Sequence, residues 1–283
     1  MSCSARRVAS VVKASRGGCG AFEGTIARDL STRYSELLPS WRVVEALQSL
    51  FEAPPPDASE LPLGQQLRDL YGGALALRPD CVYSNFVSSL DGVVAMKGAS
   101  SGPAISGRSE GDRFLMGLLR ACADCVLVGA QTFRDDAGHL WTPGYIYPPA
   151  AGEFGALRSA LKLPETPQLV VLSQSGDVDR SQPARPLVLE GERPLGSVLE
   201  ELRARGWRRV LCEGGPRVIG ELLRQSLLDD MFLTLSPVLA GRDREWRPGM
   251  VGGIELLPEH GAWGRLASAR RQGSHLFLRY DLR

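Results

Sequence analysis

Hydrophobic positions along the chain form short apolar runs that alternate with segments of helical spacing. Short continuous runs are typical of strands buried on both faces, as in a parallel sheet. Strand-like runs lie at Cys81–Val87, Cys125–Gly129, Leu169–Ser173, Pro186–Leu189, Arg209–Cys212 and Asp230–Pro237. Apolar residues have helical spacing in Gly111–Cys122, Leu195–Arg205 and Pro216–Leu227. The alternation predicts strands that are joined by crossover helices.

The C-terminal end of the chain has a different pattern. Arg265–Arg271 and His275–Leu282 are strand-like and are joined through Gln272-Gly273, which predicts an antiparallel hairpin. The predicted fold class is therefore α/β: a mixed, mainly parallel sheet with helices on both faces and a C-terminal antiparallel hairpin.

The first part of the chain is less regular. Ser40–Phe51 has the apolar spacing of a helix, and three consecutive prolines within Ala53–Asp57 cannot continue one. Leu67–Leu77 predicts a short helix that is broken at Gly72-Gly73. We assign residues 1–78 to an N-terminal extension, partly helical with a proline-rich linker and a poorly ordered start. Residues 79–283 form the main domain.

Two further segments carry weaker patterns. Val93–Met96 follows an Asp-Gly turn and predicts a second short strand. Gly138–Glu165 is rich in proline, glycine and aromatic residues and predicts surface loops, with His139 as a solvated loop histidine.

Composition and charge narrow the class of partner. The 283 residues are 43% hydrophobic with a formal net charge of +1, which gives no general attraction to nucleic acid or anionic lipid. No apolar run approaches the ~20 residues of a membrane helix, so no membrane partner is expected. Residues 1–22 are basic and serine-rich, which is compatible with a transit peptide, a disordered tail or a start codon assigned too early.

The cysteines follow no secreted disulfide pattern, which fits a reducing, cytoplasmic location. Cys122 and Cys125 form a C-x-x-C, a spacing that zinc and redox sites use. The pair lies where a helix runs into a buried strand, so we interpret both as small buried thiols.

Three segments place polar groups where predicted strands end. In NFVSSLDG, a strand delivers Ser88, Ser89 and Asp91 to a tight turn. In CVLVGAQTFRDD, Gly129-Ala130 allows close approach of a ligand, and Thr132 and two aspartates follow. Ligand sites of α/β sheets form at this edge.

The third segment, RVLCEGGPRVIG, runs from a strand through Glu213 and Gly214-Gly215-Pro216 into a helix. Proline suits the first helical turn, and free N–H groups at a helix start bind phosphate. The segment is neither G-x-G-x-x-G nor a P-loop with its lysine.

In this order, NFVSSLDG, LLRACADCVLVGAQTFRDD and CEGGPRVIGELLRQSLLDDMFLTLSPVLAG resemble the pyrimidine reductase family of riboflavin biosynthesis, the C-terminal domain of bacterial deaminase-reductases. The resemblance covers roughly residues 80–283. It implies a dihydrofolate-reductase-like fold and a homodimer. It also implies NADPH-dependent reduction of 5-amino-6-(5-phosphoribosylamino)uracil to the ribitylamino product.

The resemblance implies roles for single residues. Arg120, Glu213 and Leu140, which begins the segment that corresponds to L-T-V-R, are assigned to substrate binding. The residues assigned to NADPH are Val87, Gly129, Ala130, Thr132, Asp136, Gly214, Gly215, Pro216 and Arg217. Ser173 and Ser175 are candidates for a 2′-phosphate, or ordinary turn formers. The candidate proton donors are Glu213, Asp136 and Asp91. A carboxyl that donates a proton near neutral pH needs a pKa raised by burial.

Two departures from the family pattern bear on the substrate. Leu140-Trp141-Thr142-Pro143 stands where the family usually has L-T-V-R, so an arginine that contacts the sugar phosphate is missing. SSGPAISGRSEGDR also lacks the tryptophan often seen before the I-[ST] pair, and Arg108 or Arg113 is a candidate replacement for the missing contact.

The deaminase chemistry of the bifunctional relatives is not expected. The chain has no H-x-E followed by P-C-x-x-C, and no metal site is predicted. The alternatives to the pyrimidine reductase are an NADPH-dependent reductase of a pterin or dihydrofolate-like ring, a non-catalytic nucleotide-binding or regulatory protein that uses the N-terminal extension for a partner, and an orphan paralogue that has lost activity.

Overall fold

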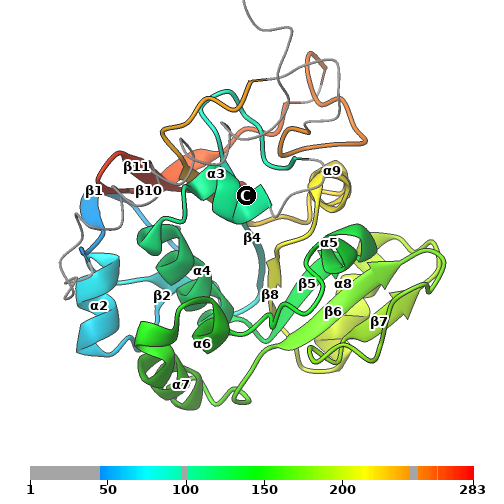
Figure 1. The fold of residues 1–283 in the computed structure, drawn as a ribbon, viewed down its shortest axis with the longest axis horizontal. Coiled ribbons are helices and arrows are strands. Elements are labelled where there is room, and N and C mark those ends of the chain that lie inside the picture. The colour runs from blue at the N-terminus through cyan, green and yellow to red at the C-terminus, as the bar shows by residue number, and fades with distance from the viewer. Residues whose placement is uncertain (1–44, 97–100, 242–247, 260) are drawn as a thin grey trace, which may run out of the picture. The chain divides into compact units, whose positions relative to one another are not determined.

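The computed structural model describes residues 45–96, 101–241, 248–259 and 261–283 (Figure 1). Within these ranges, nine strands form one sheet, and two short strands pair separately. The strands of the sheet are β1 Gln48–Glu52, β4 Cys81–Ser88, β5 Cys125–Gly129, β6 Gln168–Ser173, β7 Leu187–Glu190, β8 Arg209–Cys212, β9 Asp230–Leu235, β10 Arg265–Gln272 and β11 His275–Asp281. The separate pair is β2 Ser59–Glu60 with β3 Ala76–Leu77.

The helices are α2 Gln65–Tyr71, α3 Ser101–Ser106, α4 Glu110–Cys122, α5 Ala130–Asp135, α6 Pro143–Ile146, α7 Ala151–Ala160, α8 Leu195–Ala204 and α9 Pro216–Arg224, with a 3-10 turn, η1, at Pro148–Ala150. Among the described residues, no helix combines the length and the apolar character that crossing a membrane requires.

The sheet has the order β1-β10-β11-β9-β4-β8-β5-β6-β7. The six strands from β9 to β7 are parallel to one another, whereas β11 pairs with β9, β10 with β11, and β1 with β10 in antiparallel register. The predicted mixed, mainly parallel sheet and its C-terminal hairpin are confirmed. All six parallel strands end at the same edge of the sheet, where the polar segments of the sequence follow them.

Side chains of the central strands alternate between two hydrophobic layers. Val126 and Val128 on β5 belong to one core cluster with residues of α2, α4 and α7, while Cys125 and Leu127 belong to a second cluster with residues of α8 and α9. Helices therefore cover both faces of the sheet, as predicted (Figure 1).

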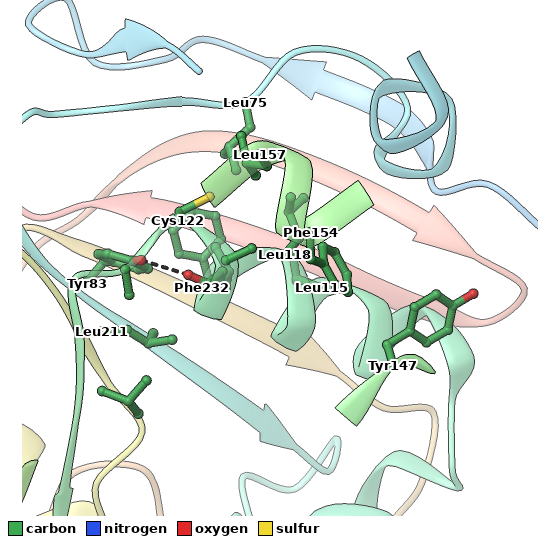
Figure 2. Close-up of a cluster of buried hydrophobic side chains, with 14 of the residues drawn as sticks. Leu75, Tyr83, Leu115, Leu118, Cys122, Tyr147, Phe154, Leu157, Leu211 and Phe232 are labelled. Carbon is green, nitrogen blue, oxygen red and sulfur yellow. Dashed lines mark hydrogen bonds between the residues drawn. The ribbon is translucent and has the colours of Figure 1, made fainter. Parts of the chain in front are cut away.

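Helix α4 packs across the first layer, beside α6 and α7. Figure 2 shows this cluster, where the Tyr83 hydroxyl donates to the Leu119 carbonyl at 2.8 Å. The rings of Phe114 and Phe154 stack with centroids 6.2 Å apart. A Cβ at Gly117 would lie 2.8 Å from the Phe154 ring, so a glycine is needed for this close packing.

Two predictions of secondary structure were wrong: one of a helix and one of loops. Gln48–Glu52 is the edge strand β1 rather than the end of a helix, because it pairs with β10 and turns Leu50 and Phe51 outward. The start of that predicted helix lies outside the described residues. Within Gly138–Glu165, predicted as loops, α6 and α7 form instead, because the prolines occupy first helical turns and the α7 side chains Phe154 and Leu157 pack into the core.

The strand predicted at Val93–Met96 was also wrong. The Ser89 amide donates to the Val93 carbonyl and the Val93 amide to the Ser89 hydroxyl, which closes a tight turn. The Val94 amide then donates to the Pro248 carbonyl rather than to a neighbouring strand, so the segment is not part of a sheet.

Residues 45–78, which the sequence assigns to an N-terminal extension, pack in one unit with the rest of the described chain. Leu47, Leu67, Tyr71 and Leu75 are buried in the same cluster as α4. The predicted short helix is confirmed as α2, and Gly72 ends it with φ 76°, where an added Cβ would lie 1.9 Å from the Leu47 carbonyl oxygen.

Candidate functional site

Two strand-to-helix turns meet at the carboxyl edge of the sheet. β5 and β8 are neighbours, and the Glu213 amide extends their ladder by donating to the Leu127 carbonyl at 3.1 Å. A Cβ at Gly214 would lie 3.4 Å from the Gly129 amide nitrogen, and one at Gly215 would lie 3.4 Å from the Thr132 hydroxyl. The turns predicted to bind cofactor are therefore in contact, and glycine leaves their backbone open to a ligand.

A buried ion pair lies beside these turns. Arg120, on the last turn of α4, donates from Nε to Glu213 Oε1 at 3.0 Å and from Nη2 to Oε2 at 2.7 Å. The two side chains are 2% and 6% exposed. They are 93 residues apart in sequence. The structure thus brings together two of the three residues that the resemblance assigns to substrate.

Aromatic side chains surround the other side of Arg120. Its guanidinium lies 5.2 Å from the centroid of the Trp141 ring, and its Nη1 lies 3.1 Å from His139 Nε2. The imidazole meets the rings of Trp141 and Tyr145 edge-on, with centroids 4.9 Å away in both cases. His139 lies on a loop, as predicted, but it is half-buried against Arg120 rather than solvated. Burial and the neighbouring Arg120 charge lower the pKa of His139 to about 4.

Asp136 ends α5 close to this pair. It is half-buried, and burial raises its pKa, with a further contribution from the Asp135 and Glu213 charges and an opposing one from Arg120. A carboxyl whose pKa is raised is suited to donating a proton near neutral pH.

Asp112, which sequence reasoning did not identify, is a buried carboxyl in the first turn of α4. It is 4% exposed, and burial raises its pKa to about 6, with the Glu213 charge adding to the rise. Its sequence context is an ordinary acidic helix start after the Ser109 cap, so the only available signal was its spacing of eight residues from Arg120, which places both on one helix face.

Asp91 holds two loops together. Its carboxylate accepts from the Ser89 hydroxyl at 2.6 Å and from the amides of Ala240 and Gly241. The Ser89 hydroxyl, and then the two amides, lower the pKa of Asp91 to about 2. Asp91 is therefore ionised at neutral pH. Val87 lies near the carboxyl end of β4, opposite Thr234 of β9.

A cavity of about 380 Å³ lies further along the same edge, between the ends of β6 and β7 and the helices α8 and α9. Ser173, Arg193, Arg217 and Val218 contribute to its lining. Val218 also meets the two glycine turns, since a Cβ at Gly214 would lie 3.2 Å from its Cβ. Arg217 makes no ion pair with any described residue. Val218 therefore borders both the cavity and the turns, and Arg217 gives the cavity a cation.

Three further predicted residues lie at the start of α5, in the loop after it and at the start of α9. Ala130 and Leu140 are half-buried, and Pro216 is the first residue of α9. Cys122 and Cys125 are buried thiols, as interpreted from the sequence, and burial raises the pKa of Cys122 to about 12. No group of three or more potential metal ligands occurs among the described residues.

Comparison with known proteins gives the family. A curated reductase from Aquifex aeolicus, 2,5-diamino-6-ribosylamino-4(3H)-pyrimidinone 5′-phosphate reductase, is 26% identical over 179 residues, which cover 58% of this chain and 79% of that protein. The solved structure of a pyrimidine reductase-like protein from Corynebacterium diphtheriae superposes with a TM-score of 0.59 at 21% identity, over 72% of this chain and 92% of that one.

Acinetobacter baumannii RibD superposes with a TM-score of 0.56 at 18% identity, over 71% of this chain and 58% of that one. These two likenesses between structures show a common fold. The family model of the RibD C-terminal domain matches residues 80–258, a range that contains both glycine turns, Arg120 and Glu213. The chain belongs to the RibD C-terminal domain family, a family of pyrimidine reductases.

Proposed function

We propose that this chain is an NADPH-dependent reductase that converts 5-amino-6-(5-phosphoribosylamino)uracil into its ribitylamino product. The observation that carries the proposal is the buried Arg120–Glu213 pair, held next to two open glycine turns in a chain of this family. The proposal includes a homodimer, as the resemblance implies, and a cytoplasmic location, as the cysteine pattern suggests.

The carboxyl edge of the sheet fits an extended dinucleotide. Gly214 and Gly215 lead into α9, whose first-turn N–H groups suit a pyrophosphate. The cavity that contains Ser173 and Arg217 suits the adenosine half with its 2′-phosphate, which favours NADPH over NADH. Val87, Gly129, Ala130, Thr132, Asp136 and Pro216 would complete this binding edge. When bound, NADPH supplies the hydride, and the protein supplies orientation and proton transfer.

Substrate binding is assigned to three residues of the protein. Arg120 has five N–H donors, of which three are used by Glu213 and His139, so two remain for an acceptor on the substrate. Leu140 lies on the same loop as His139 and would contact the same substrate. Glu213 fixes the guanidinium and faces the substrate.

Opening of the ribose ring and reduction of the resulting imine need a proton donor. Asp136 is the best placed of the three candidates, because burial raises its pKa. Asp91 is ionised with a pKa of about 2, which makes it the weakest candidate. Glu213 acts as acid only if the ion pair with Arg120 opens during turnover.

A second candidate function is the reduction of a pterin or dihydrofolate-like ring. The segment that lacks the arginine expected from the resemblance begins at Leu140. Its Trp141, and Tyr145 on the following helix α6, lie next to Arg120 and His139. Aromatic side chains suit a flat heterocycle better than a sugar phosphate.

The deciding experiment is NADPH oxidation by the purified chain with the two substrates in parallel. Turnover of the phosphorylated pyrimidine alone supports the first candidate, and turnover of dihydrofolate alone supports the second. NADPH binding without turnover of either would contradict both and leave a nucleotide-binding protein. Asp136→Asn is expected to reduce turnover at saturating NADPH, whereas Glu200→Gln, at an exposed position on α8, is the matched control.

A further inference from the structure

His139 makes a contact to Arg120 that fixes its own protonation. An arginine guanidinium can only donate hydrogen bonds, so Nε2 of His139 must accept the bond from Arg120 Nη1 at 3.1 Å. The ring proton of the neutral imidazole then lies on Nδ1. Arg120 is therefore held from two sides, by the Glu213 carboxylate and by the His139 ring nitrogen.

The orientation of the imidazole is fixed by its neighbours. The Trp141 and Tyr145 rings meet it at interplanar angles of 71° and 87°. Trp141 is 5% exposed, and Tyr145 is anchored where the Thr142 hydroxyl accepts from its amide at the start of α6. Trp141 therefore confines the imidazole on one side, whereas the Tyr145 ring is 48% exposed and is anchored only through its backbone amide, so Trp141 is the firmer of the two supports.

The ion pair alone does not hold the guanidinium in one plane. The Arg120–Glu213 bonds lie along one edge of the guanidinium, so the fork can still rock about that edge. The bond from Nη1 to His139 leaves along a different direction and removes this freedom. It also decides which N–H groups stay available for a substrate.

We propose that His139 is a positioning residue, which sets the plane of the Arg120 guanidinium and so aims its two remaining N–H groups at the substrate. This inference rests on the proposed function, because it assumes that Arg120 contacts substrate. The inference also indicates which kind of chemical group on the substrate Arg120 would bind. Glu213 balances the charge of Arg120, so the pair presents hydrogen-bond donors without net charge, which suits a neutral acceptor such as a ring carbonyl.

The charged and titratable groups around His139 set its response to pH. These are Arg120 from α4, Glu213 after β8, Asp136 at the end of α5, and Tyr145 on α6. Protonation would place a cation against Arg120 and remove the acceptor. Since burial lowers the pKa of His139 to about 4, the imidazole stays neutral and its contact stays intact between about pH 5 and 9.

The test compares His139→Gln with His139→Leu. Both remove the ring, but the glutamine Oε1 reaches the position of Nε2 and can accept from Arg120, whereas leucine cannot. His139→Leu is expected to lower kcat by roughly 10-fold to 100-fold with an unchanged Kd for NADPH, the effect of a misplaced substrate contact. His139→Gln is expected to stay within about 3-fold of the original, well inside that range.

Equal losses in the two variants, in an active enzyme, would overturn the inference, because only packing would then matter. A His139-dependent limb near pH 6.5 in the kcat profile would also overturn it. If the unchanged protein turns over neither substrate, the proposed function fails, and the nitrogen chemical shifts of the His139 ring still decide the geometry. A proton on Nδ1 supports the inference, and a proton on Nε2 contradicts it.

Discussion

Replacing Asp112 with asparagine should stabilise the protein at neutral pH. Asp112 is buried, and burial raises its pKa to about 6 from 3.8. Below about pH 3 the carboxyl is protonated in both folded and unfolded chains and contributes little difference. As the pH rises from 3 to 6, the unfolded chain ionises first, so the free energy of unfolding falls and then stays lowered above pH 6. The shift corresponds to about 3 kcal/mol, because each pKa unit is about 1.4 kcal/mol.

Asparagine keeps the size of the side chain and removes the charge, so the Asp112→Asn variant should regain up to about 3 kcal/mol at pH 8 and only about 0.5 kcal/mol at pH 4. Urea unfolding at pH 4, 6 and 8 measures this difference. Asp177→Asn, at an exposed position after β6, is the matched control and should leave the free energy of unfolding close to that of the original. A variant that is no more stable than the original at pH 8, or equally stabilised at every pH, would falsify the electrostatic reasoning.

The other predictions concern packing and ion pairing. Arg120→Met should lower the free energy of unfolding in urea by about 3–5 kcal/mol, because it leaves the Glu213 carboxylate buried without a partner. Adding Glu213→Gln to this variant should restore much of the loss. Equal stability of the single and double variants would contradict this. Gly220→Ala should lower the melting temperature, since its Cβ would lie 2.2 Å from the Gly252 carbonyl oxygen, at a cost of about 1–3 kcal/mol. The control is Gly155→Ala in α7, which has open space and should be neutral or stabilising by up to ~1 kcal/mol. Arg158→Met should loosen the end of α4, since Nη1 of Arg158 donates to the carbonyls of residues 120, 121 and 123. The measurement is hydrogen-exchange protection in Leu119–Cys122, which should fall. Unchanged protection would show that these bonds do not hold the helix end.

The parts of the fold that the sequence predicted well are those that its local pattern determines. A strand such as Cys125–Gly129 is apolar at every position because both faces are covered, and the Gln272-Gly273 turn joins strands adjacent in sequence. β1 could not be predicted in this way. Its partner β10 is more than 200 residues distant, as the bond between Arg271 and Gln48 over 223 residues shows, and its outward-facing Leu50 and Phe51 imitate a helical repeat.

The site was predictable only in part, for a similar reason. The glycine turns carry a signal within a few residues, and the family resemblance assigned both Arg120 and Glu213 to the substrate. Burial of Asp112 and His139 depends on side chains that arrive from other elements, so neither residue differs in sequence from a helix-start acid or a loop histidine. The segment 138–165 was misjudged because its prolines and glycines indicate loops, although the prolines fall at positions where helices tolerate them.

The charges along the carboxyl edge constrain where a substrate phosphate can bind. The Arg120 charge is balanced by Glu213 within the buried pair, so a dianion placed there would force a buried carboxylate and a phosphate close together. A phosphate must therefore lie outside the pair, where a cation is exposed to solvent. Arg113 fits this requirement, because it lies one residue after Asp112, on the exposed side of α4, and its Nε donates to the Ile146 carbonyl at the end of α6. Under the proposed function, a phosphorylated substrate would place its heterocycle against Arg120 and its phosphate near Arg113, so helix α4 would supply the phosphate contact that the resemblance led us to expect after Leu140.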